Sequence, residues 1–134
     1  MLCHIRELTI QIADVYGKIL KYTDMKVGNL AKSKKDTHQH VITTTIGKLS
    51  NSLHGKSGAI DLSEVKCIVI DEADFFFSDP ENYNQLKTMY KTFLAPNKNQ
   101  NIQYVLFSAT YPPEVYKQIG GLFGEASQIK IENS

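Results

Sequence analysis

Apolar residues along the chain follow two different spacings, and the two alternate from one end to the other. Residues 6–22, residues 80–94 and the segment after Pro113 carry apolar side chains three and four positions apart, which is typical of helices with one buried face. Short segments that suit strands stand between them, at 25–28, 40–45, 65–70 and 102–107. Strands that alternate with helices in this way predict an α/β fold in which helices flank a parallel sheet.

Local signals refine these elements. Asp79 and Pro80 predict the start of the second helix, and the pair at 112–113 predicts the start of the third, which glycines between 120 and 124 should end. The segment 65–70 contains Cys67, Ile68, Val69 and Ile70 without polar interruption, which predicts a strand that is buried on both faces. Less marked patterns favour a short helix at 47–54, a loop or short helix at 32–36 and a last strand at 128–131. In the first helix the residues expected to face inward are Leu8, Ile12, Val15, Tyr16, Ile19 and Leu20.

The composition fits one globular domain over residues 1–134, with 42% apolar and 22% charged side chains. Cys3 and Cys67 lie far apart, which argues against a disulfide scaffold or zinc ribbon and favours a reducing compartment. The net charge of +1 excludes a strongly basic nucleic-acid coat and leaves room for a small basic site. The sequence has neither an apolar stretch near the roughly 18 residues of a membrane span nor a signal-peptide pattern. We therefore expect a cytoplasmic or nuclear protein with no membrane partner.

Polar residues follow two of the predicted strands at their carboxyl ends, where ligands bind in open parallel sheets. Asp71, Glu72 and Asp74 come directly after the 65–70 strand. One carboxylate at such an edge can hold magnesium through its water shell, and a second can take a proton from an attacking water. From position alone, an acidic cluster after a strand is more often a solvated turn or a helix cap than a catalytic site.

The exact strings narrow the choice. Residues 70–74 spell I-D-E-A-D, and residues 107–110, after the next strand, spell F-S-A-T. Residues 3–8 (C-H-I-R-E-L) and 45–48 (T-I-G-K) are similar to the P-T-R-E-L and T-P-G-K motifs of the same family. With four motifs in the family's order, the chain resembles the first RecA-like lobe of the DEAD-box RNA helicases over nearly its whole length. The surroundings of 106–111 look somewhat like the mRNA-export subfamily.

The resemblance implies roles for the residues after the two strands. Asp71 would bind water-shelled magnesium, and Glu72 would be the general base for ATP hydrolysis. Asp74 would link to Ser108 and Thr110, which would couple the nucleotide site to RNA strand separation. The implied cofactors are therefore ATP and Mg²⁺.

The resemblance also implies an RNA path, on which hydroxyls, backbone N–H groups and cations contact phosphates without sequence preference. In this sequence the family's RNA-facing proline and threonine are replaced by His4 and Ile5, a second proline is Ile46, and Asn29 stands where the family has a second glycine. The expected partners are RNA and the second RecA-like lobe of the same enzyme. The residues matching RNA-contacting positions are Arg6, Gly28, Thr45, Gly47 and Lys48.

The adenine-recognising glutamine motif and the P-loop have no counterpart in these 134 residues. The tripeptide at 55–57 is G-K-S, but it lacks the P-loop's other glycine and its strand-to-helix setting, so a surface loop is expected. One hypothesis is therefore that the chain is part of an ATP-dependent RNA helicase and has little activity in isolation. The alternatives are a catalytically inactive module that binds RNA or protein, and a metal-dependent hydrolase that uses the three carboxylates.

Three other clusters favour ordinary structural interpretations. His38 and His40 resemble a metal pair but have no third ligand nearby in sequence, so a solvated loop is expected. The lysines at 32, 34 and 35 fit a solvated surface better than an RNA contact. Among Phe75, Phe76 and Phe77, some should pack under the sheet edge, and an exposed one would mark a partner surface.

Overall fold

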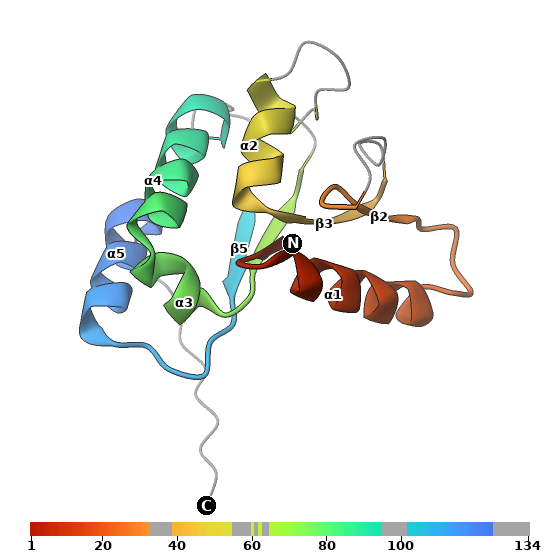
Figure 1. Cartoon of the computed structure of the whole chain (residues 1–134), viewed down its shortest axis with the longest axis horizontal. Coiled ribbons are helices and arrows are strands. Elements are labelled where there is room, and N and C mark those ends of the chain that lie inside the picture. Colours follow the sequence, from red (N-terminus) through yellow and green to blue (C-terminus); the bar gives the residue numbers. More distant parts are fainter. Residues whose placement is uncertain (33–38, 55–59, 61, 63–64, 95–101, 125–134) are drawn as a thin grey trace, which may run out of the picture.

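The sheet confirms the predicted α/β class. The computed structural model describes residues 1–32, 39–54, 60, 62, 65–94 and 102–124. All strand pairs in this part of the chain are parallel, in the order β2-β3-β1-β4-β5 (Figure 1). The strands are β1 (Leu2–Cys3), β2 (Val27–Asn29), β3 (Val41–Thr45), β4 (Cys67–Ile70) and β5 (Gln103–Leu106).

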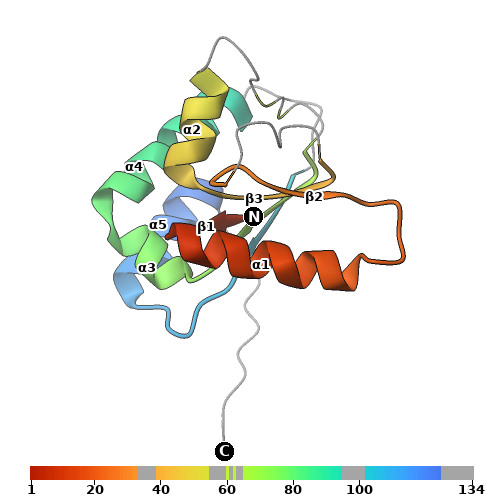
Figure 2. The same cartoon turned by 45° about the vertical axis from the view of Figure 1, so that its right-hand side comes forward.

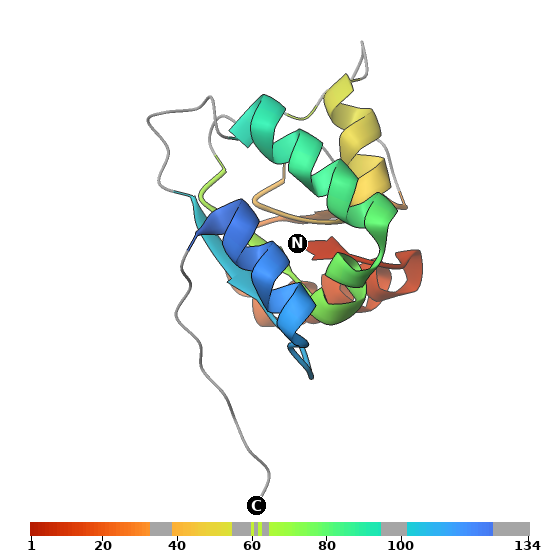
Figure 3. The ribbon, with the colours of Figure 1, turned by 90° about the vertical axis from the view of Figure 1, so that its left-hand side faces the viewer.

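Helices cover the two faces of the sheet unequally. The first helix, α1 (Arg6–Ile19), lies against β1, β2 and β3 on one face. The other helices gather on the opposite face, as the turned views show (Figures 2 and 3). They are α2 (Ile46–His54), α3 (Ala73–Ser78), α4 (Pro80–Met89) with its π-helical continuation η1 (Tyr90–Leu94), and α5 (Pro113–Phe123).

The hydrophobic core lies between the sheet and these four helices. Ile68 and Ile70 of β4 point into it, and Phe76 and Phe77 of α3 are almost completely buried there. Near the N-terminal end of β5, the rings of Tyr90, Tyr104 and Phe123 pack together, and the ring centroids of Tyr104 and Phe123 are 4.4 Å apart. Burial, followed by the nearby Tyr90, raises the pKa of Tyr104 to about 12.

The prediction that 65–70 is buried on both faces is wrong. Along β4 the side chains alternate: Cys67 is exposed, Ile68 and Ile70 are buried, and Val69 is half-buried. Val69 pairs in register with the half-buried Val105 of β5, and neither belongs to the core cluster. The physical reason is that α1 contacts β1, β2 and β3, which leaves the same face of β4 and β5 less covered within the described residues.

The inward face of α1 is also narrower than expected. The helix ends at Ile19, and Val15 and Ile19 are exposed at 54% and 69%, whereas Leu8, Ile12 and Tyr16 are at least half-buried. The C-terminal end of α1 extends beyond β2, the strand at the edge of the sheet (Figure 2). Periodicity alone therefore overestimated the buried face.

Local signals predicted the starts of the helices α4 and α5 correctly. Asp79 caps α4, its carboxylate accepting the N–H of Glu81 over 3.0 Å, and Pro80 occupies the first turn. The expected end of α5 is only partly right, because the helix continues through Gly120 and Gly121 and ends at Phe123, with Gly124 as its C-cap residue at φ +82°. The short helix α3 was not predicted. The 128–131 strand and most of 32–36 lie outside the described residues.

Candidate functional site

The carboxyl ends of the strands bring the predicted site residues to one edge of the sheet. Along this edge the order of strands places Gly28 first, then Thr45 and α2, then β1 with Arg6, then Asp71, and finally the segment after β5 with Ser108. The predicted RNA-contacting residues therefore lie on the β2-β3-β1 side, and the predicted catalytic residues on the β4-β5 side. The strand β1 forms the boundary between the two groups.

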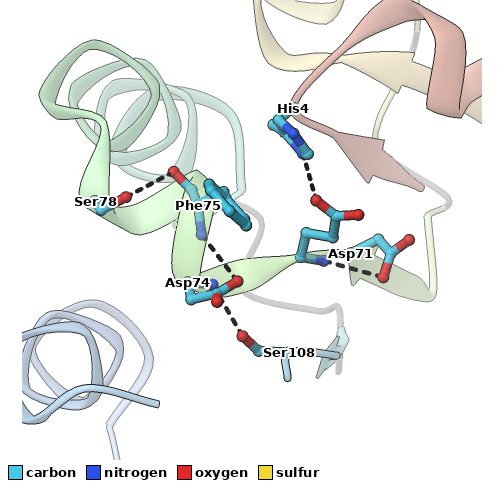
Figure 4. A network of polar contacts seen from close by, with 7 residues as sticks. His4, Asp71, Asp74, Phe75, Ser78 and Ser108 are labelled. Carbon is cyan, nitrogen blue, oxygen red and sulfur yellow. Dashed lines mark hydrogen bonds and ion pairs between the residues drawn. The ribbon is translucent and has the colours of Figure 1, made fainter. Parts of the chain in front are cut away.

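Asp71 and Glu72 follow β4 directly. The N–H of Asp71 donates to the carbonyl of Leu2 over 3.1 Å, and Oδ1 of Asp71 accepts the N–H of Glu72 over 3.0 Å (Figure 4). Glu72 has φ 49° and ψ 54° and is the one non-glycine residue with positive φ in the described chain. This left-handed conformation costs roughly 1–2 kcal/mol for a residue with a Cβ. Such strain is concentrated at functional sites, which agrees with the role expected for Glu72.

Asp74, Ser108 and Thr110 meet as expected. The Thr110 hydroxyl donates to Oδ2 of Asp74 over 2.8 Å. The Ser108 hydroxyl accepts the N–H of Asp74 over 3.2 Å (Figure 4). It donates to the carbonyl of Thr110 over 2.6 Å. Backbone bonds reinforce this joint, because the N–H of Ala73 donates to the carbonyl of Phe107 over 2.9 Å.

The electrostatics of Asp74 follow from these contacts. Partial burial acts to raise its pKa, but the hydrogen bonds from the Thr110 hydroxyl and the N–H of Phe75 outweigh burial and lower the pKa below its ordinary value. Because the Ser108 proton points to the carbonyl of Thr110, the Thr110 hydroxyl and the Phe75 N–H are the donors to the carboxylate. Asp74 therefore stays ionised and acts as a hydrogen-bond acceptor at neutral pH.

The predicted RNA-contacting residues differ in accessibility. Arg6 and Lys48 are exposed at the first turns of α1 and α2, and the Arg6 Nε donates to the carbonyl of Ala31 over 3.3 Å. The Thr45 hydroxyl accepts the N–H of Lys48 at 3.4 Å, and Gly47 lies in α2. Gly28, in contrast, is buried in the middle of β2, so any contact with RNA there requires its backbone.

A buried polar network next to this region was not predicted. Asn29, at the substituted glycine position, donates from Nδ2 to the Thr9 hydroxyl over 3.1 Å and accepts the N–H of Ala31 over 2.9 Å. The Thr43 hydroxyl donates to the carbonyl of Thr9 over 3.0 Å. The network ties α1, β2 and β3 together, and the sequence signal for it was a polar side chain at the end of an apolar strand.

A second unpredicted contact joins β1 to the acidic segment. His4 Nδ1 lies 3.3 Å from Oε2 of Glu72, and the imidazole stacks on the ring of Phe75, with centroids 5.5 Å apart and planes at 14°. Phe75 is 61% exposed, whereas Phe76 and Phe77 are buried, as expected for a mixed cluster. The signal that could have found this contact is the histidine at a position where the resembled family has proline.

The donor set fits a water-held cation better than a directly bound one. In the described part of the chain, three or more His, Cys, Asp or Glu side chains never gather closely enough to hold a metal ion. The Oδ2 of Asp71 has no hydrogen-bond partner among the described residues, so this oxygen can accept from the water shell of Mg²⁺. His38 and the 55–57 tripeptide lie outside the described residues, while His40 accepts the N–H of Lys26 at Nδ1.

An all-parallel sheet with helices on both faces, and with carboxylates and hydroxyls at its carboxyl edge, defines an α/β domain of the type that binds ligands at this edge. Solved structures narrow the fold to the RecA-like domain of DEAD-box helicases. Dbp5 of S. cerevisiae, bound to RNA and ADP BeF3, superposes with a TM-score of 0.81 at 22% identity, covering 98% of this chain and 33% of Dbp5. A hypothetical ATP-dependent RNA helicase from Sulfolobus tokodaii gives 0.72 at 27% identity, covering 94% of this chain and 38% of the other.

Sequence comparisons give the family. Residues 1–119 match the family model described as DEAD/DEAH box helicase, and the chain belongs to that family. The ATP-dependent RNA helicase SUB2 of Phaeosphaeria nodorum is 31% identical over 127 residues, covering 86% of this chain and 27% of SUB2. SUB2 of Kluyveromyces lactis is 33% identical over 127 residues, covering 86% of this chain and 28% of SUB2. The chain thus spans little more than a quarter of the length of these relatives.

Proposed function

We propose that this chain supplies the magnesium-binding, water-activating and RNA-contacting residues of an ATP-dependent RNA helicase that separates RNA strands or remodels RNA–protein complexes. The observation that carries the proposal is the joint between Asp74, Ser108 and Thr110. It connects the acidic segment after β4 to the segment after β5, so a change at one is transmitted to the other. Such a joint is what coupling between hydrolysis and RNA requires.

The catalytic roles are divided between two neighbouring carboxylates. Asp71 would hold Mg²⁺ through the ion's water shell with Oδ2, which has no hydrogen-bond partner among the described residues, and the Glu72 N–H fixes its other oxygen. Glu72 would orient the attacking water and accept its proton, and Mg²⁺, when bound, would supply charge stabilisation to the phosphates. The γ-phosphate binding elements come from outside these 134 residues.

The RNA path crosses the β2-β3-β1 half of the edge. Arg6 and Lys48 offer exposed cations, and Thr45 offers a hydroxyl beside the N-terminal turn of α2. These groups bind phosphates and sugars, which carry no base information. Binding by the isolated chain should therefore be weak, salt-sensitive and indifferent to sequence. Fluorescence anisotropy with two unrelated single strands at two salt concentrations measures this, and a strong preference for one strand contradicts it.

The deciding experiment places these residues in a complete helicase framework. In a chimera, they replace the matching segment of SUB2 from Kluyveromyces lactis, and RNA-stimulated phosphate release is measured. We expect turnover that Glu72→Gln abolishes and that Glu81→Gln, an exposed change in α4, leaves unchanged. A folded chimera without turnover overturns the proposal. The isolated 134 residues, which contain no P-loop motif, should not hydrolyse ATP at a helicase-like rate with or without RNA.

A second candidate is a catalytically inactive module that binds RNA or protein. The substitutions at His4, Ile5 and Ile46 favour it, because they alter two predicted RNA motifs. A folded but inactive chimera that still binds RNA would select this candidate.

The partners and the place of action belong to the same proposal. A second RecA-like lobe would close on the edge that carries Glu72 and Thr110. We place the protein in the cytoplasm or nucleus, and its membership of the mRNA-export subfamily stays a prediction. None of the helices in the described part of the chain is long and apolar enough to cross a membrane.

A further inference from the structure

We propose that His4 is a positioning residue for Glu72: its Nδ1–H holds the Glu72 carboxylate, and the ring of Phe75 holds the imidazole. The inference rests on the proposed function only in giving Glu72 the part of general base. The contact itself follows from the sheet and from the chemistry of the three side chains.

The register of the sheet brings the two residues together. Leu2 of β1 pairs with Ile70 of β4, and His4 and Glu72 each lie two positions beyond this pair. The N–H of Asp71 donates to the carbonyl of Leu2, which keeps the chains paired up to the point where they leave the sheet. The central strand β1 therefore brings position 4 next to the acidic segment.

The backbone of Glu72 leaves its side chain free to meet His4. Glu72 is the N-cap residue of α3, but its carboxylate makes no cap hydrogen bond to the described first turn. The left-handed backbone directs the carboxylate away from the helix, and Oε2 lies 3.3 Å from Nδ1 of His4. The Glu72 side chain keeps 40% of its surface exposed, so it remains open to water and ligand.

Within the described residues, Glu72 is the group that Nδ1 of the His4 imidazole faces. Nδ1 is shut off from solvent and makes no aligned hydrogen bond within the described residues, which leaves Glu72 at ion-pair distance as the group it faces. A carboxylate can only accept hydrogen bonds, so the contact is attractive only if the proton is on Nδ1. The stacked ring of Phe75 keeps the imidazole in this plane, and that explains an exposed aromatic residue directly after the acidic string.

The arrangement gives His4 a place between the two halves of the edge. Two residues after His4, Arg6 begins α1 on the RNA-contacting side, while the imidazole contacts the catalytic side. A movement of the β1 end on RNA binding would move the group that holds Glu72. The contacts of the imidazole are with Glu72 and Phe75, so the proposed effect of His4 on hydrolysis acts through Glu72.

The tautomer of His4 tests the proposal directly in the isolated chain. Long-range ¹H–¹⁵N correlation spectra at about pH 8, where an ordinary histidine is neutral, report which ring nitrogen carries the proton. We expect Nδ1–H for His4. His40 is an internal control with the opposite expectation, because its Nδ1 accepts the N–H of Lys26 over 2.9 Å and its proton is therefore on Nε2. His4→Asn and His40→Asn identify the two sets of signals.

Variants separate the contact from a general loss of structure. Glu72→Ala should shift His4 towards Nε2–H, whereas Glu72→Gln, which keeps an acceptor oxygen, should preserve Nδ1–H. An unchanged His40 pattern shows that each variant is folded. An Nε2–H tautomer of His4 in the unmodified chain overturns the proposal, whatever the variants do. Since the measurement needs no ATP hydrolysis, an inactive chimera and a wrong His4 tautomer are separate outcomes.

Discussion

The hydroxyl of Thr110 donates a hydrogen bond to Oδ2 of Asp74 over 2.8 Å, although the two residues are 36 positions apart in the sequence. The bond joins the segment after β5 to the first turn of α3. Together with the Ser108 contact, it makes Asp74 the acceptor at the centre of a small network. Removing the charge of Asp74 should therefore change the pH dependence of stability more than removing the charge of an exposed carboxylate does.

Asp74→Asn should reduce the acid sensitivity of the fold. The pKa of Asp74 is lowered from its ordinary 3.8, so its charge stabilises the folded state above about pH 3.8, and this contribution is lost as the pH falls through the lower folded value. Urea unfolding at about pH 5 and about pH 2 measures the loss, which should be smaller in Asp74→Asn. Asp14→Asn, an exposed change in α1, should follow the unmodified chain. Equal losses in all three would contradict the prediction.

The three phenylalanines after the acidic string should differ sharply in their contribution to stability. Phe76 is fully buried, so Phe76→Ala should cost about 3–5 kcal/mol in the free energy of unfolding or leave the chain unfolded. Phe75 is 61% exposed, and Phe75→Ala should cost about 1 kcal/mol or less. Denaturant unfolding of both variants compares them on one scale. Similar costs for the two would mean that α3 is packed differently.

Sequence reasoning succeeded where a signal is local. The alternation of the two apolar spacings gave the parallel α/β fold, and Asp79 with Pro80 gave the start of α4. The short helix α3 was not predicted because six residues contain too few turns to show a helical period. In addition, its N-cap residue Glu72 has a left-handed conformation, which no sequence signal indicated. The short strings at the strand ends located Asp74 and Thr110 before their hydrogen bond was visible.

Sequence reasoning failed where the answer depends on which elements cover which. The pattern of Val65–Ile70 is compatible with burial on both faces, but the coverage of Cys67 and Val69 depends on where α1 lies. The contact between His4 and Glu72 depends on the register of β1 against β4, which short apolar runs do not specify. The network of Asn29 with Thr9 is of the same kind.

The two cysteines should react at very different rates with a thiol reagent. Burial, the largest cause, raises the pKa of Cys3 to about 11, whereas Cys67 is exposed on the open face of β4. At about pH 8 a disulfide reagent such as dithionitrobenzoate should modify Cys67 quickly and Cys3 only after denaturation. Cys67→Ser should abolish the fast phase. Two fast thiols in the unmodified chain would contradict the burial of β1 in the centre of the sheet.

The last prediction concerns the outer strand of the sheet. Within the described residues β5 is paired on one side only, with β4, and Val105 and Val69 form a half-buried apolar pair on the less covered face. An apolar strand with an unpaired edge tends to pair with another chain. We expect the isolated chain to be marginally stable and to associate as its concentration rises.

Light scattering and thermal unfolding test this expectation. Val105→Lys should reduce association, because a charge on an edge strand opposes pairing between chains. Val15→Lys, which places the same charge on the exposed outer half of α1, should leave association unchanged and serves as the matched control. A chain that stays monodisperse and melts cooperatively without any substitution would show that the sheet tolerates its open edge. That result would favour the independent binding module over a catalytic lobe that needs further strands.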